Sequence, residues 1–199
     1  MQNNGVATTE APIKRERIRK DTYAIRKTLG IENEPYFDIV RHLELILQRI
    51  NPDFYLCPVK DNELPRRFAV TLADGSEIRI RESVYNAAVT GHPWARIILA
   101  HELAHLMYHT GSDVVYAKAM PGTKIPPEYQ VEFQADMFAA ELLMPLHLIR
   151  GKTVREVMRL CGVTRKAAET QLRHARTVCK KHAKKLKARC KKKTTKYVT

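Results

Sequence analysis

The sequence has few cysteines and no CxxC pair. Its four cysteines lie far apart among the 199 residues, at Cys57, Cys161, Cys179 and Cys190. A disulfide framework or a cysteine-based redox or metal site would show closely spaced or regularly spaced cysteines. We therefore expect the four thiols to be reduced and mostly incidental.

Long hydrophobic runs are also absent. The first twenty residues, MQNNGVATTEAPIKRERIRK, lack the apolar core of a secretory signal. The most apolar stretch, residues 96–109, is interrupted by His101, Glu102 and His105 well before it reaches the length of a membrane span. We therefore expect a cytoplasmic protein with no membrane partner.

Acidic residues are missing from the C-terminal end. Between Arg173 and Lys196 the chain carries twelve lysines and arginines and no aspartate or glutamate. These charges leave only +2 of the net charge of +14 for the rest of the chain. A basic tail of this kind can contact nucleic acid non-specifically by releasing counterions, or it can simply keep the protein soluble. The sequence leaves both interpretations open.

The pattern of apolar residues predicts an α+β fold with a small antiparallel sheet. Residues 1–19 are polar and without periodicity, which predicts disorder. Helical spacing, alternation and turn residues then predict two N-terminal helices in 21–30 and 35–50, a strand in 54–60, a strand, turn and strand in 67–82, a helix buried on most sides in 93–109, a helix in 126–145, and two short helices broken at Cys161-Gly162 within 153–178.

The pentapeptide HELAH, residues 101–105, lies inside the apolar helix. Residues four apart on a helix lie on one face, so His101 and His105 can reach the same ion. Glu102 lies beside them, close enough to contact a water on that ion without being a ligand. Zinc bound in this way acidifies its water, and the carboxylate can take the proton and pass it to the leaving amine.

The alternative is that these polar residues occur by chance. In a chain of this length and histidine content, an HExxH match arises in roughly one sequence in fifty. Burying unpaired polar groups on an apolar helix costs on the order of 1–3 kcal/mol each, and a metal would satisfy all three. We therefore predict a metal site.

A third ligand has to come from another part of the chain. His109 is about 12 Å along the helix axis from His101 and about 80° around it, too far for the same ion. Gly111 stands where a metzincin has its third histidine, which excludes that class. The next helix offers Glu132 and Asp136, four apart on one face, although a glutamate on a helix is by itself usually a solvated charge.

The helix predicted in 126–145, which carries Glu132 and Asp136, resembles the ExxxD pattern of gluzincins. In that pattern the glutamate is the third metal ligand, and the aspartate orients a ligating histidine through its free ring nitrogen. The resemblance assigns these two roles to Glu132 and Asp136.

Two motifs together resemble a known family. RIILAHELAHLMYH, followed by EFQADMFAAELLMP, is similar to the ImmA/IrrE metallopeptidases, formerly the DUF955 group, and the second motif is the more discriminating. The resemblance implies a zincin-like core in which one zinc ion is held by His101, His105 and Glu132, with Glu102 as the general base. It also implies a substrate, since the better-known members cleave an XRE-type helix-turn-helix repressor of a mobile element or stress regulon.

The resemblance also suggests how the chain is divided. We expect a disordered segment at 1–19, a peptidase domain at 20–150, a small helical segment at 151–178 and a basic tail at 179–199. The tail lies outside the family pattern, and Ala104 replaces a glycine that the family often has between the two histidines.

Contacts to the substrate are predicted less sharply. His109 and Tyr108 are candidates for contacts to the substrate or transition state, and His109 could equally be an outer residue of the metal site or a helix cap. On chemistry alone, the groups that could stabilise an oxyanion are Tyr85, His92, Tyr108, His109 and Tyr129. One strand of residues 68–82 is expected to border the cleft, with a purely structural hairpin as the alternative.

Two other functions remain open. The chain could be a DNA-binding regulator in which GVTRKAAETQLRHA acts as a helix-turn-helix and the basic tail anchors it, although few of its residues suit reading base edges. It could also be a toxin-like member of a two-gene module, with zinc serving only stability.

Overall fold

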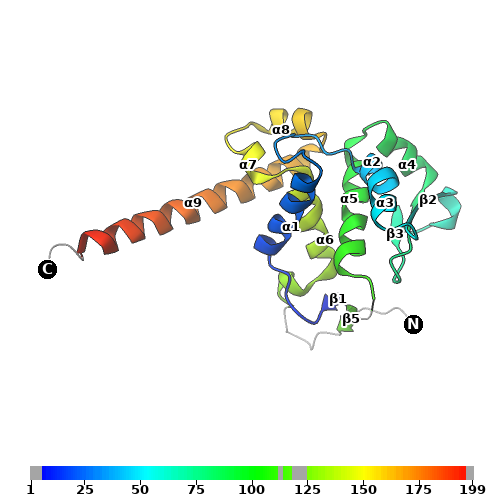
Figure 1. Cartoon of the computed structure of the whole chain (residues 1–199), viewed down its shortest axis with the longest axis horizontal. Coiled ribbons are helices and arrows are strands. Elements are labelled where there is room, and N and C mark those ends of the chain that lie inside the picture. Colours follow the sequence, from blue (N-terminus) through cyan, green and yellow to red (C-terminus); the bar gives the residue numbers. More distant parts are fainter. Residues whose placement is uncertain (1–5, 112–113, 118–124, 196–199) are drawn as a thin grey trace.

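The computed structural model describes residues 6–111, 114–117 and 125–195, and for residues 114–117, 181–182 and 184–195 it describes the backbone alone. Figure 1 shows a helical body with a small sheet on one side and one long helix that extends away from it. In chain order the elements are β1 (Val6–Thr9), α1 (Arg15–Thr28), α2 (Ile39–Arg41), the π-helix η1 (His42–Leu47), α3 (Gln48–Ile50), β2 (Tyr55–Val59), the 3-10 helix η2 (Asp61–Glu63), β3 (Ala69–Thr71), β4 (Glu77–Arg81), α4 (Glu82–Val89), α5 (Pro93–Tyr108), β5 (Val114–Ala117), the 3-10 helix η3 (Pro127–Tyr129), α6 (Val131–Leu143), α7 (Leu146–Ile149), α8 (Val154–Cys161) and α9 (Arg165–Thr195). The predicted α+β class is confirmed.

The larger sheet has the strand order β2-β4-β3. β3 and β4 pair antiparallel around the predicted turn, in which Gly75 has a φ of +75° and the Asp74 carboxylate accepts hydrogen bonds from the backbone N and Oγ of Ser76. β2 pairs with β4 in parallel. The sheet is therefore mixed, whereas the sequence predicts an antiparallel one, because the pairing partner of β2 depends on a chain crossover that leaves no local pattern.

In the β3 segment the large apolar residues do not mark the face that packs against α5. Phe68, just before the strand, is 54% exposed, whereas Ala69 is buried. Ala69 pairs with Ile80, and Thr71 pairs with Ile78. The two isoleucines are fully buried, so these four residues form the inner face of the hairpin. A small side chain and a hydroxyl on this face let β3 approach α5 closely.

α5 is buried on most of its sides, as predicted. It packs against β3 and α4 on one side and against α6 on the other, and α1 covers α6. Its residues Leu99, Ala100, Leu103 and Ala104 are at most 1% exposed, and Phe138 of α6 is fully buried. The helix that carries HELAH therefore lies at the centre of the core.

A buried arginine fixes the start of α5 against the turn between α8 and α9. Arg96 donates hydrogen bonds to the carbonyl oxygens of Phe37 and Cys161, at 2.7 and 2.8 Å, and to that of Gly162. Gly162 has a φ of +60°, and a Cβ atom there would collide with Arg96 Nη1. Both constraints require glycine at the predicted helix break.

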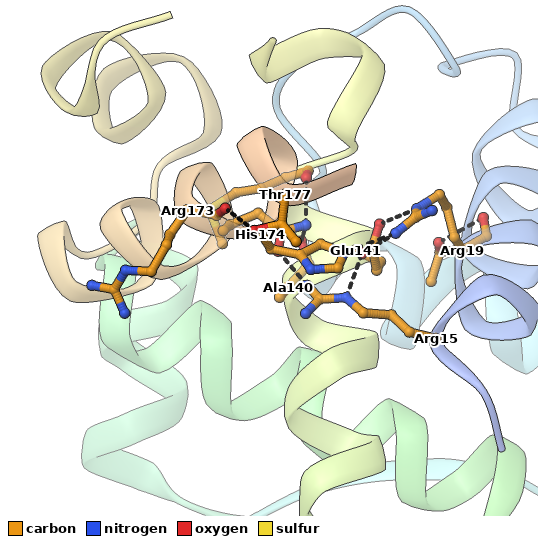
Figure 2. Close-up of polar contacts among 10 residues, drawn as sticks. Arg15, Arg19, Ala140, Glu141, Arg173, His174 and Thr177 are labelled. Atoms are coloured by element: carbon orange, nitrogen blue, oxygen red, sulfur yellow. Dashed lines mark hydrogen bonds and ion pairs between the residues drawn. The ribbon is translucent and has the colours of Figure 1, made fainter. Parts of the chain in front are cut away.

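Glu141 of α6 forms a second buried polar cluster (Figure 2). Its fully buried carboxylate accepts hydrogen bonds from Arg15 Nε at 2.7 Å and Arg19 Nε at 3.0 Å, both on α1. His174 of α9 lies 3.8 Å from the same carboxylate and 3.0 Å from Arg19 Nη2. One side chain thus joins α1, α6 and α9.

The prediction of disorder over residues 1–19 is wrong for the described part of that range. β1 pairs antiparallel with β5, and α1 begins at Arg15. The partners of both elements lie more than 100 residues away, so no local pattern reveals them. Residues 1–5 lie outside the described residues.

No structural boundary separates the helical segment ending at 178 from the basic tail. α9 continues through both as one helix to Thr195, and residues 196–199 lie outside the described residues. Within the described ranges, no helix has the length and apolar character needed to cross a membrane.

Candidate metal and catalytic site

A cleft of about 750 Å³ lies beside the exposed part of α5. One wall is the hairpin segment 67–73, which includes β3, and the other includes Val131, Glu132 and Asp136 at the start of α6, with Ala7 of β1. The expectation that a strand of residues 68–82 borders the cleft is confirmed. Among the described residues β3 pairs only with β4, so its other edge is free.

Three predicted ligands come together in this cleft. His101 Nε2 lies 3.0 Å from His105 Nε2 and 3.2 Å from Glu132 Oε2, and His105 Nε2 lies 3.7 Å from Glu132 Oε1. The ligand atoms of a tetrahedral zinc site are about 3.3 Å apart, close to these three separations. The donor set therefore fits one metal ion, and α5 and the first turn of α6 provide it.

Asp136 holds the ring of His101. Its Oδ1 lies 3.0 Å from His101 Nδ1, and because a carboxylate only accepts, Nδ1 carries the proton and Nε2 is left for the cluster. Burial lowers the pKa of His101, but the hydrogen bonds to Asp136 and Glu132 outweigh it and raise the pKa to about 9. A metal ion would therefore have to displace a proton from this ring.

His109 does not join the ligand set, as the helical geometry predicts. Its Nδ1 lies 3.0 Å from His105 Nδ1, and its Nε2 lies 2.7 Å from Oε1 of Gln134. The residue is 8% exposed, and burial lowers the pKa of both His109 and His105. Both ring nitrogens of His109 are thus engaged inside the protein, which leaves neither free for a substrate.

Glu102 lies next to the ligands and is almost fully buried, with 8% exposure. The Thr71 hydroxyl of β3 lies 2.8 Å from Glu102 Oε2 and 3.0 Å from the backbone oxygen of Glu102. Burial raises the pKa of Glu102, while the hydrogen bond from Thr71 opposes this shift. Thr71 is not among the site residues predicted from the sequence. It lies two residues from Ala69 on the strand and therefore shares its face, and a polar residue on that face could have indicated a contact with the site.

The predicted role of Tyr108 in substrate contact is wrong. Its hydroxyl donates a hydrogen bond to Asp21 of α1 at 2.7 Å, and its ring packs edge-on against Phe138 of α6. Tyr108 therefore contacts α1 and α6 and does not line the cleft. Of the five oxyanion candidates, all within the described ranges, His109 lines the cleft and Tyr85, His92, Tyr108 and Tyr129 do not.

Comparison with known families supports the resemblance in the two motifs. Residues 90–173 match the family model Peptidase_M78, described as the IrrE N-terminal-like domain. The matched range contains the HELAH helix, the helix with Glu132 and Asp136, and the start of α9. No curated protein matches the chain.

Proposed function

We propose that this chain, which carries a Peptidase_M78 domain of the IrrE N-terminal-like family at residues 90–173, is a zinc-dependent endopeptidase that cleaves a protein partner. The observation that carries the proposal is a pair of imidazole nitrogens and a carboxylate within 4.8 Å of one another, beside a buried glutamate in an open cleft. His101, His105 and Glu132 would hold the ion.

The donor set favours zinc over other ions. Imidazole nitrogens suit zinc better than magnesium or calcium, which prefer oxygen ligands. Three protein ligands with a fourth position open to the cleft are typical of catalytic zinc sites, and a closed set of four is typical of structural ones. Zinc bound here would lower the pKa of water and polarise the scissile carbonyl group.

Glu102 is the proposed general base. The single hydroxyl proton of Thr71 lies within reach of both Oε2 and the backbone oxygen of Glu102. No described side chain donates to Oε1 of Glu102, which can therefore accept a proton from the attacking water. The same oxygen can then deliver that proton to the leaving amine. A raised pKa brings the carboxyl closer to the pH of the reaction, which suits a group that both takes and gives a proton.

The substrate would bind as an extended chain along β3. The free edge of β3 offers main-chain hydrogen-bonding groups, and the apolar residues Phe68, Ile97, Ile98 and Val131 line the same cleft. We propose an XRE-type helix-turn-helix repressor as the substrate, and the support for this choice is the resemblance of the HELAH and FAAELLMP motifs to the ImmA/IrrE family.

The experiment is a cleavage assay with an XRE-type helix-turn-helix repressor as the candidate substrate. Wild-type protein with zinc is expected to cut it at one site, which mass spectrometry of the products identifies. A chelator should abolish cleavage, and added zinc should restore it. Cleavage that persists in the chelator would contradict a metal-dependent reaction.

A second candidate activity is contact with nucleic acid through α9. The absence of acidic residues between Arg173 and Lys196 favours it. The start of α9 is packed into the body, where Gln171 donates hydrogen bonds to the backbone oxygens of Ala140 and Met144. This packing favours non-specific binding by the distal half over a helix-turn-helix that reads bases.

A further inference from the structure

We propose that Gln134 and His109 are positioning residues that decide which ring nitrogen of His105 carries the proton. They would thereby present His105 Nε2, without a proton, to the metal ion. The inference rests on the proposed metal site, but the hydrogen bonds that carry it exist in the protein alone.

The first step is the orientation of the Gln134 amide. Gln134 is fully buried, and its Nε2 lies 2.7 Å from the backbone oxygen of Glu128 and 2.9 Å from Thr9 Oγ1. A backbone oxygen can only accept, so the amide NH₂ has to face Glu128. Oε1, an acceptor, is therefore the atom that faces His109.

The second step follows for His109. Its Nε2 lies 2.7 Å from Gln134 Oε1 and must donate to it. A buried, neutral imidazole carries one N–H, so Nδ1 of His109 has only a lone pair. That nitrogen can accept a hydrogen bond and cannot donate one.

The third step fixes His105. Its Nδ1 lies 3.0 Å from the Nδ1 of His109, and since the latter accepts, His105 has to donate. The lone pair of His105 then lies on Nε2, the atom that approaches His101 Nε2 and Glu132. Once the proton that a metal ion displaces has left His101, both metal-binding histidines have the same tautomer, set for His101 by Asp136 and for His105 by an amide and an imidazole.

The hydrogen-bonded series from Gln134 through His109 to His105 contains no charged group, and the charge of the cleft explains why this is favourable. Glu102, Glu132 and Asp136 already bring three carboxyl groups to the cleft. A fourth carboxylate behind His105 would make the site more negative and weaken the polarising effect of a bound ion. An amide and an imidazole orient the ring without adding charge.

The two groups that hold the Gln134 amide lie outside the metal-binding helices. Thr9 belongs to β1 and Glu128 to η3, so the amide that orients His109 is itself held by two segments that contact α6. This arrangement gives β1, which sequence reasoning missed, a part in the site.

The test compares zinc affinity in four variants by competition with a chromogenic chelator. His109→Leu removes both ring nitrogens, and we expect the zinc dissociation constant to rise about 10- to 100-fold. His109→Gln supplies one acceptor and one donor and should restore most of the affinity. Gln134→Met should weaken binding in the same direction. Tyr108→Phe, which removes a hydrogen bond from the same helix outside the cleft, should leave affinity unchanged.

A second readout does not require metal or activity. In metal-free wild-type protein, the ¹⁵N shifts of His105 are expected to show a protonated Nδ1, and His109→Leu should lose this preference. Zinc affinity equal to wild type in His109→Leu, or a protonated Nε2 on His105 in the metal-free protein, would overturn the inference. If wild type binds no zinc, the proposed metal site fails, while the tautomer of His105 still decides the inference.

Discussion

Thr71 holds Glu102 with a single hydroxyl proton, and this contact is the most direct test of how the base is positioned. In Thr71→Val we expect kcat/KM for cleavage to fall about tenfold, since Glu102 loses its only side-chain partner among the described residues. Zinc content should stay unchanged, because Thr71 does not contact the ligands. Thr71→Ser keeps the hydroxyl and should retain most of the rate. An unchanged rate in Thr71→Val would show that Glu102 is positioned by its backbone alone.

Asp136 is predicted to raise metal affinity through His101. Asp136→Asn keeps an acceptor for His101 Nδ1 but removes the negative charge that makes the ring a stronger donor to metal. We expect the zinc dissociation constant to rise about tenfold. The matched control is Asp21→Asn, at a carboxylate that contacts Tyr108 and Arg17 outside the cleft. Equal losses in both variants would point to a general loss of stability.

At the residue scale, sequence spacing predicts pairs within one helix and misses partners on other elements. His101 with His105, and Glu132 with Asp136, are each four residues apart and share a face. The contacts of Thr71 with Glu102 cross from a strand to a helix and have no fixed spacing. The wrong expectation for Tyr108 has the same cause, because its partners Asp21 and Phe138 lie on α1 and α6.

The packing of α1, α6 and α9 depends on the buried carboxylate of Glu141 (Figure 2). Removing it in Glu141→Ala takes away the carboxylate that pairs with Arg15 and Arg19, and we expect a loss of about 3 kcal/mol in the free energy of unfolding. The arginines are 20% and 29% exposed, so water can compensate them in part. Urea unfolding measures the change.

The control for Glu141 is a glutamate on the surface of α9. Glu169→Ala breaks an exposed ion pair with Arg165, and its effect on stability should be close to zero. If Glu141→Ala were as mild as this control, the cluster would not hold the three helices together.

At the element scale, predictability follows how local the cause is. α5 and α6 have apolar periodicity, proline near their starts and clear ends, and the sequence predicts both. The hairpin is predicted because Asp74-Gly75 supplies the turn chemistry. β1 was missed, because its partner β5 lies more than 100 residues away.

The charge of the whole molecule is concentrated at one end. We expect the full chain to retard random-sequence DNA in a gel shift at low salt, and the complex to dissociate steeply as salt rises. A chain ending at Val178 should lose this binding and keep its cleavage activity. It should still fold, because the α9 residues that are buried among those with described side chains, Ala168, Gln171, Leu172 and Ala175, precede the cut. Sequence-selective binding by the shortened chain would instead favour a DNA-binding regulator.

The sequence predicts this uneven charge distribution but not the structure of the segment that carries it. Twelve basic residues without acids suggested a separate tail, whereas the backbone continues as one helix to Thr195. The break at Gly162 was predicted correctly because glycine there is required both by a positive φ and by the guanidinium of Arg96.

The central claim is that a metal held by His101, His105 and Glu132 works with Glu102 to hydrolyse a peptide bond. The most direct measurement is cleavage of the helix-turn-helix protein by Glu102→Gln, with zinc content measured on the same sample. We predict one zinc ion per chain and a cleavage rate about 10²- to 10⁴-fold below wild type. Wild-type cleavage by this variant would contradict the claim and assign the site a structural role.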